Sequence, residues 1–342
     1  MTPITFLLQR TLLTIGFYAV VSVCILSPLV TEAARMMPLP QDVSLTVTPQ
    51  SPAANSAATV SLSAFGNDTS DVTIEWQIDG APRPGLKNER SITVGTGNPG
   101  SVTKIDALVR ARGISARKLS RVITPVSVDV IVEPDSYVPA RFSGRALPSA
   151  GSAIRLVAVP HFFTNGVPVP SDAIAYDWSV NGNSIYGGAA MGKNVTTFTM
   201  PTIGNPQISL VATTRGGLYA RSDMTLRITK PIVSFYENST LYGTILQSFE
   251  KFLVPKDEIV VNAEPYYLPR ASLIPGALSY TWTVDGKQTT NPSTDPRSIT
   301  LRKIEAGVAA KIGFSFVSTG ESLDYGGDTF TVDFTDPSVL PL

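Results

Sequence analysis

The chain has 342 residues, a formal net charge of zero and a charged fraction of 16%, below that of an average globular domain. A balanced charge excludes the basic surface that nucleic-acid binding requires, so no nucleic-acid partner is expected. With one cysteine, Cys24, and one histidine, His161, the chain can form neither an internal disulfide nor a Cys/His zinc site, and no metal or cofactor is expected.

The first predicted element is an apolar segment near the N-terminus. Residues 11–30 carry no charged side chain, and Arg10 precedes them. A helix of this length would extend about 30 Å, enough to cross a bilayer core. Residues 1–38 are interpreted as an apolar helix followed by a short linker. The helix is either an uncleaved signal-anchor or a cleaved signal peptide, and both alternatives stay open. Arg10 favours a cytoplasmic N-terminus, so the following domains are expected to be extracytoplasmic, tethered to the cell membrane through residues 11–30 or secreted.

Three tryptophans recur in one local pattern, 102 and 104 residues apart. Each has a polar residue on either side and apolar residues beyond, and an Asp-Gly or Asn-Gly pair follows. Period-two alternation places the indole on the apolar face of a strand, and the positive-φ pair closes a hairpin. The predicted core tryptophans and turn glycines are Trp76 with Gly80, Trp178 with Gly182, and Trp282 with Gly286.

The period near 100 residues predicts three tandem domains after the N-terminal helix. Strand-like runs flank each tryptophan, with turn residues about every ten positions. Six or seven short strands per repeat indicate an all-β chain of two-sheet sandwiches. The predicted repeats cover residues 39–125, 126–230 and 231–342, with Pro125 and Pro231 at the joins.

A short helix is predicted within the third repeat, near residues 240–253. Leu241, Ile245, Phe249 and Phe252 follow at steps of four, four and three, which lines one helical face. The other two repeats have no comparable apolar insert at this point. We therefore expect the join between repeats two and three to be stiffer than the first join.

The Tyr-x-Trp-x-Val-Asn/Asp-Gly strand and hairpin at residues 176–182 and 280–286 resembles the PKD and bacterial immunoglobulin-like domain superfamily. The whole arrangement is similar to signal-anchored bacterial surface proteins that carry such repeats. The resemblance implies immunoglobulin-like, PKD-like sandwiches with display, spacing and adhesion roles, and it brings no catalytic residues with it.

Catalytic chemistry is not expected. His161 is the single histidine and no cysteine is exported, so a Ser-His-Asp or Cys-His arrangement could use only His161. His161 is interpreted as a structural loop residue between apolar neighbours. The carboxylates are scattered and are interpreted as solvated turn residues. Glu133 and Asp135 could offer oxygens to a calcium ion at the join of repeats one and two, although this spacing is too common to be specific.

Two hypotheses for the function remain. The first is a non-catalytic, membrane-tethered stalk, adhesin or binding module with an unknown protein or glycan ligand. The alternative is a structural or accessory subunit of an envelope assembly, such as a pilus or secretion apparatus, that pairs through its sheet edges. Self-association is required only by the alternative.

Overall fold

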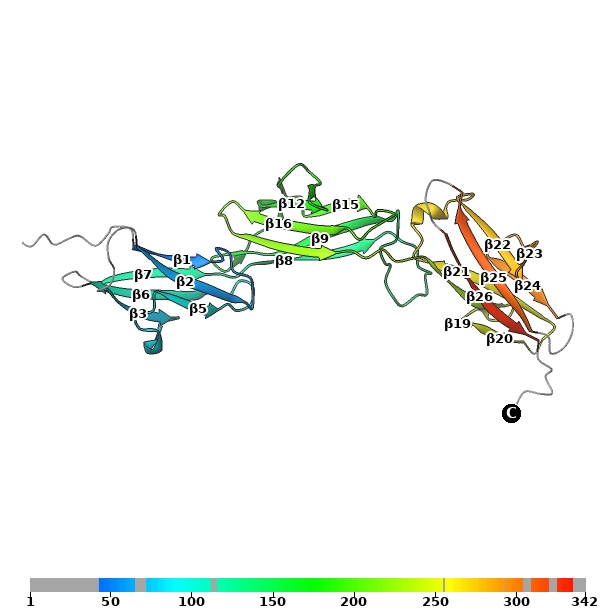
Figure 1. Cartoon of the computed structure of the whole chain (residues 1–342), viewed down its shortest axis with the longest axis horizontal. Helices are drawn as coiled ribbons and strands as arrows, with labels where there is room; N and C mark the ends of the chain where they lie inside the picture. The colour runs from blue at the N-terminus through cyan, green and yellow to red at the C-terminus, as the bar shows by residue number, and fades with distance from the viewer. Residues whose placement is uncertain are drawn as a thin grey trace, which may run out of the picture.

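The structure is a computed structural model and describes residues 43–64, 72–111, 116–254, 256–291, 293–303, 309–319 and 325–334. The strands form three immunoglobulin-like sandwiches arranged end to end in an elongated row, with the third inclined to the first two (Figure 1). Helical structure in these ranges is limited to the 3-10 turns η1 (Pro84–Leu86), η2 (Ser171–Ala173) and η3 (Arg270–Leu273).

The predicted membrane segment, residues 11–30, lies outside the described residues. None of the helical segments that the structure does describe is long and apolar enough to cross a membrane.

The first sandwich packs a three-stranded sheet, in the order β1-β2-β5, against a four-stranded sheet, in the order β4-β3-β6-β7. Period-two alternation turns one face of each strand toward a shared core, which contains Trp76 and Ile105. The bounds are β1 (Val43–Thr48), β2 (Ala57–Ala64), β3 (Val72–Ile78), β4 (Ala81–Pro82), β5 (Ser91–Gly95), β6 (Thr103–Ala111) and β7 (Arg117–Ile123).

The second sandwich repeats this plan with sheets β15-β9-β8 and β13-β12-β16-β17, and β14 also pairs with β12. Its core contains Trp178 and Leu210. The bounds are β8 (Ser127–Pro134), β9 (Ala153–His161), β10 (Phe163–Thr164), β11 (Val167–Pro168), β12 (Ile174–Val180), β13 (Asn183–Ser184), β14 (Ala190–Met191), β15 (Val195–Thr199), β16 (Gln207–Thr214) and β17 (Tyr219–Thr225).

The third sandwich consists of sheets β19-β18-β21-β24 and β20-β26-β25-β22-β23 around a core that contains Trp282 and Phe330. The bounds are β18 (Ile232–Ser239), β19 (Gly243–Ser248), β20 (Lys251–Leu253), β21 (Glu258–Tyr266), β22 (Leu278–Val284), β23 (Lys287–Thr289), β24 (Ser298–Arg302), β25 (Ala309–Ser318) and β26 (Tyr325–Asp333).

The first strand of each sandwich is followed by a crossing segment, which carries the chain to the opposite sheet. In the first two sandwiches the segment ends at an isolated parallel bridge, Ala53 with Val126 and Ser149 with Thr229. In the third, β20 pairs in parallel with β26. The crossing takes residues 49–52 in the first sandwich but 135–148 and 240–250 in the other two. The last two repeats therefore carry longer insertions at equivalent points.

The helix predicted near residues 240–253 is wrong, because this segment forms β19 and β20. Gly243 adopts a positive φ of 69° at the start of β19, which ends the preceding turn and is incompatible with a continuous helix. The apolar positions also do not share a face. Leu241 is 84% exposed at the hairpin tip, whereas Phe252 is buried in the sandwich core.

Candidate functional site

The tryptophans of the three repeats occupy equivalent positions in the three cores, with exposed fractions of 1%, 0% and 2%. Each indole N–H donates a hydrogen bond of 2.9 Å to a backbone carbonyl in the segment that follows its hairpin. The pairs are Trp76 with Glu89, Trp178 with Lys193, and Trp282 with Pro296. Because each ring is buried and its single N–H donor has an acceptor, the tryptophans have a structural role at this position.

The Asp/Asn-Gly pairs form the two-residue turns of hairpins β3–β4, β12–β13 and β22–β23. Both turn residues have positive φ, for example 50° at Asp79 and 79° at Gly80, as type I′ turns require. The side-chain oxygen of the first turn residue also accepts a backbone N–H from the adjacent strand. These pairs are Asp79 with Lys104, Asn181 with Gln207, and Asp285 with Lys311. Gly182 and Gly286 occupy the second turn position in the other two hairpins.

The floor of a groove is formed by the outer face of β21 in the third sandwich. Val261 and Ala263 on this strand point into the core, so the alternate residues Asn262, Glu264 and Tyr266 belong to the opposite face. An aromatic and polar row therefore replaces the short polar side chains that an exposed sheet face normally carries.

The insertion of the second sandwich forms one wall of this groove. Ser136 makes an antiparallel bridge with Pro269, and the main chain of Tyr137 exchanges hydrogen bonds with Leu268 (2.6 Å) and Tyr267 (2.7 Å). Phe142 packs edge-on against Tyr266, with ring centroids 5.2 Å apart. The insertion thus extends from its own sandwich and pairs with the next one.

The hairpin of β18 and β19 forms the opposite wall. At its tip, the hydroxyl oxygen of Ser239 accepts the backbone N–H groups of Leu241 and Tyr242. Tyr242 is 83% exposed and lines the groove, whereas the adjacent Leu241 does not line it. The hairpin tip therefore presents one aromatic ring toward the groove.

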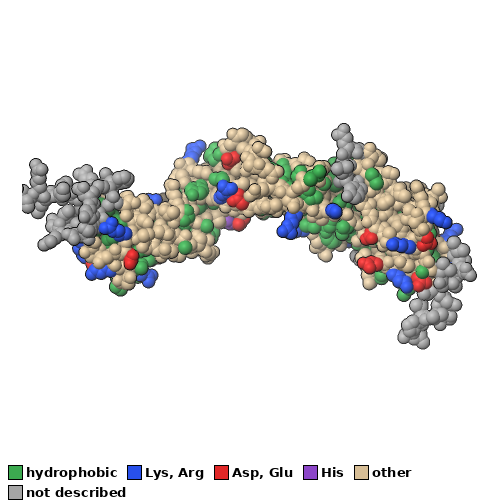
Figure 2. Space-filling model, viewed as in Figure 1, with side chains coloured by type: hydrophobic (Ala, Val, Ile, Leu, Met, Phe, Trp, Pro, Cys, Tyr) green, Lys and Arg blue, Asp and Glu red, His purple; other side chains and the backbone are tan. Residues whose placement is uncertain are grey.

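The groove has a volume of about 500 Å³ and lies between the second and third sandwiches. Figure 2 shows apolar side chains gathered on the surface around this join. The lining comprises Tyr137, Pro139, Ala140, Arg141, Phe142 and Ser143 from the insertion, and Tyr236, Tyr242, Gly243, Thr244, Asn262, Glu264 and Tyr266 from the third sandwich. No Leu, Ile, Val or Met is among these lining residues.

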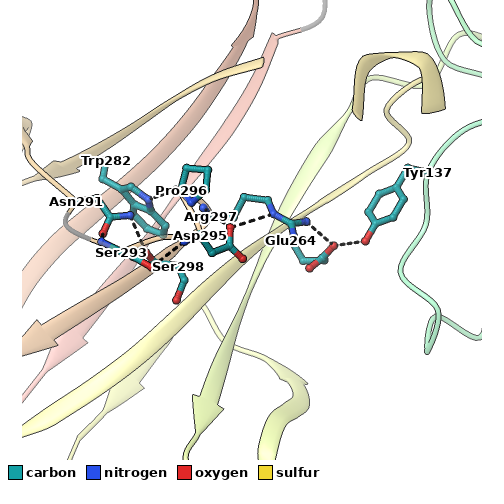
Figure 3. Close-up of polar contacts among 9 residues, drawn as sticks. All are labelled: Tyr137, Glu264, Trp282, Asn291, Ser293, Asp295, Pro296, Arg297 and Ser298. Carbon is teal, nitrogen blue, oxygen red and sulfur yellow. Dashed lines mark hydrogen bonds and ion pairs between the residues drawn. The ribbon is translucent and has the colours of Figure 1, made fainter. Parts of the chain in front are cut away.

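A chain of polar contacts joins the insertion to the third sandwich (Figure 3). Tyr137 donates its hydroxyl hydrogen to Oε1 of Glu264, and Arg297 lies 3.4 Å from the same oxygen. Arg297 also pairs with Asp295 at 3.5 Å. Burial, together with the hydrogen bond to the Glu264 carboxylate and its charge, raises the pKa of Tyr137 to about 12. The Tyr137 hydroxyl is therefore protonated at neutral pH and acts as a donor.

Two further groups on the floor are relevant to ligand binding. The hydroxyls of Tyr236 and Tyr266 are hydrogen-bonded to each other, and burial raises the pKa of Tyr266. In contrast, Oδ1 of Asn262 is buried and has no hydrogen-bond partner among the described residues. An unmade hydrogen bond of this kind costs about 1–3 kcal/mol, so the site favours a ligand that donates to it.

The other candidates from the sequence lie away from the groove. The prediction that His161 lies in a loop is wrong, because it is the last residue of β9 and pairs with Ser127 of β8; its Nε2 lies 3.0 Å from Asp129. Glu133 pairs with Arg155, and Asp135 pairs with Arg270 at 3.0 Å. The expected place of Glu133 and Asp135 at the first join is wrong, because β8 runs the length of the second sandwich and ends at the second join.

No group of three or more metal-ligating side chains that could hold an ion occurs within the ranges that the structure describes. The lining of the groove offers a carboxylate, hydroxyls, an amide and a guanidinium, and among these residues there is no histidine or cysteine. This set suits hydrogen bonding and ring contacts with a bound molecule.

Sequence reasoning missed every residue of the groove. The available signal was the unequal length of the crossing segment, because insertions relative to a repeat often carry function. The insertion at residues 240–250 departs from the other repeats by its apolar periodicity, which predicts a helix, and the one at 135–148 has no such periodicity.

No protein-family model matches the chain, and no curated protein matches its sequence. Among solved structures, it is similar to the three N-terminal domains of the outer capsid protein Hoc of bacteriophage RB49, with 13% identity over 86% of this chain and 98% of that one and a TM-score of 0.24. The central fibronectin-III array of RIM-binding protein matches with 13% identity, 86% and 97% coverage, and a TM-score of 0.29. A C-terminal fragment of intimin, solved with the intimin-binding domain of its translocated receptor, matches with 13% identity, 57% and 66% coverage, and a TM-score of 0.31.

Proposed function

We propose that the chain is a non-catalytic, membrane-tethered extracytoplasmic protein. In this proposal the first two sandwiches act as a stalk and the join of the second and third binds a ligand. The uncharged run of residues 11–30 after Arg10 supports tethering, because it is long enough to span a bilayer and its charge asymmetry favours export of the three sandwiches. The Trp-x-Val-Asn/Asp-Gly hairpins support placing the repeats with PKD-like domains.

The observation that carries the binding role is the origin of the groove. Its two walls are insertions in different sandwiches, residues 135–148 and 240–250, at the point where the first sandwich crosses with residues 49–52 alone. A stalk needs only the short crossing. The two longer insertions form the walls of a groove of about 500 Å³, and this volume is in the range of pockets that hold small ligands.

Tethering is tested with the full chain in cells. In a Cys24→Ser background, Ser143→Cys places a single exposed thiol in the insertion. We expect a membrane-impermeant maleimide to label this thiol in intact cells, with the labelled protein retained in the membrane fraction. Labelling only after permeabilisation would refute export, and recovery of the labelled protein in the medium would refute tethering.

The binding role is tested with the full chain in proteoliposomes, incubated with the envelope fraction of the source organism. We expect retention that Tyr242→Ala abolishes and Leu241→Ala does not, since the two side chains are adjacent and equally exposed but only Tyr242 lines the groove. Retention that both variants preserve, together with self-association of the wild-type chain, would instead favour the subunit of an envelope assembly.

A further inference from the structure

Resting on the proposed function, we propose that the groove binds a carbohydrate. A sugar ring stacks on the ring of Tyr242, and one of its hydroxyl groups donates a hydrogen bond to Asn262. Four features of the groove support this ligand class: the composition of its lining, its floor, its unused hydrogen-bond acceptor and its charge.

The lining pairs aromatic rings with polar groups and contains no branched aliphatic side chain. Five aromatic rings line the groove, those of Tyr137, Phe142, Tyr236, Tyr242 and Tyr266. Hydroxyl, amide, carboxylate and guanidinium groups lie alongside them. A lipid chain would be matched by large aliphatic side chains, and this lining offers only Pro139 and Ala140. The face of a pyranose ring presents C–H groups with partial positive charge, which complement the negative face of an aromatic ring.

The floor offers side chains and few backbone groups. Tyr236 on β18 adjoins the β21 face in the floor, and β18 pairs with β19 and β21 while β21 pairs with β18 and β24, so neither strand is an edge of the sheet. An added peptide strand needs a free sheet edge, which β18 and β21 do not supply. Recognition at the floor therefore depends on hydroxyl, amide and carboxylate side chains, whose partners on a sugar are hydroxyls that both donate and accept.

Asn262 supplies the unused acceptor. Its side chain is half-buried in the floor and makes no hydrogen bond to a described residue, while its Oδ1 atom is buried. Binding therefore requires the amide to turn its oxygen toward the groove, and this turn breaks no hydrogen bond to a described residue. A ligand hydroxyl at this point satisfies the oxygen, and the energetic gain favours a donor over an apolar group.

The charges of the groove are mostly neutralised within the protein. Glu264 is held by Tyr137 and Arg297, so its carboxylate is not a free anion. Arg141 is exposed in the lining and makes no ion pair with a described residue. The groove therefore accommodates an uncharged sugar, and Arg141 at its side would strengthen binding of one that carries a carboxylate.

The experiment uses the purified full chain in detergent on an array of immobilised neutral and acidic oligosaccharides, followed by titration calorimetry with the best soluble oligosaccharide. We expect binding that Tyr242→Ala weakens by about tenfold, because one aromatic contact is lost. Tyr242→Phe, which keeps the ring, should bind within about twofold of wild type, and so should the control Leu241→Ala. Asn262→Leu, which removes the acceptor without removing a protein hydrogen bond, should also bind about tenfold more weakly.

The proposal is overturned if no oligosaccharide binds, or if binding is unchanged in both Tyr242→Ala and Asn262→Leu. The two assays can also disagree. If Tyr242→Ala abolishes retention of the protein on the envelope fraction but no oligosaccharide binds, the binding role stands and the carbohydrate is refuted. A preference for acidic oligosaccharides that Arg141→Ala removes would support the carbohydrate and identify its charged form.

Discussion

The hydroxyl of Tyr137, in an insertion of the second sandwich, donates a hydrogen bond to the carboxylate of Glu264, which lies 127 residues later on the outer face of the third. Tyr137 also packs against the hydrophobic core of the third sandwich. A residue that precedes most of the second sandwich in sequence is thus a structural part of the next. This contact links the ligand groove to the geometry of the join.

Replacing Tyr137 with Phe should loosen the join while keeping the ring in place. The variant loses a hydrogen bond to a charged, half-buried group, which is worth about 1.5–3 kcal/mol. We expect faster hydrogen exchange in peptides that cover residues 135–143 and β21. The matched control is Tyr186→Phe, which removes a hydroxyl bonded only within the second sandwich. Equal exchange at the join in both variants would refute the coupling.

The join should also weaken at high pH. The pKa of Tyr137 is about 12 in the folded chain against an ordinary value of 10.0, so the folded state holds this proton more tightly than the unfolded state does. The stabilisation is complete below pH 10 and is lost as the pH rises through about 12. Urea unfolding of the full chain should show a stability loss between these values that is smaller in Tyr137→Phe. A loss of the same size in both proteins would contradict the assignment.

Each core tryptophan should stabilise its own sandwich. Trp178→Ala removes a fully buried ring and its hydrogen bond to Lys193, which should cost about 3–5 kcal/mol. Hydrogen exchange should then accelerate throughout β8–β17 and much less in the first sandwich, whose core cluster is separate. Uniform acceleration over all three cores would show instead that they unfold as one unit.

The hairpin turns can be tested by a pair of glycines in the first sandwich. Gly80 has a φ of 79°, and a Cβ there would meet no atom within 4 Å, so Gly80→Ala should cost about 1–2 kcal/mol through backbone strain alone. Gly85 is equally uncrowded but lacks a positive φ, and Gly85→Ala should be nearly neutral. Thermal unfolding of the two variants measures the difference, and equal melting temperatures would argue against strain at the turn.

The periodic features of the sequence were sufficient to predict the all-β class and the repeated hairpins. Alternation around Trp76, Trp178 and Trp282 is a local pattern, and Asp-Gly or Asn-Gly supplies the positive φ that a two-residue turn needs. These relations hold within a few residues, where the chain's own chemistry determines the backbone. The third hairpin has the same geometry as the first although little else in their sequences agrees.

The segment at residues 240–253 shows where local periodicity failed. Steps of three and four residues match a helical face, but the turn between β18 and β19 places Leu241 in solvent, and β20 places Phe252 in the core. Pairing of β20 with β26, far away in sequence, selected this conformation. Propensity over a short window is weak beside the hydrogen bonds and burial that a neighbouring sheet offers.

The sequence by itself determined which residues alternate, turn and enter a core. Only the tertiary structure decided that residues 135–148 and 240–250 face each other, because these insertions are brought together by the join of two sandwiches. No local pattern encodes the contact of Tyr137 with Glu264, since it depends on how far β8 extends and on which face of β21 is left uncovered. The groove is a product of packing between domains, which depends on residues far apart in the chain.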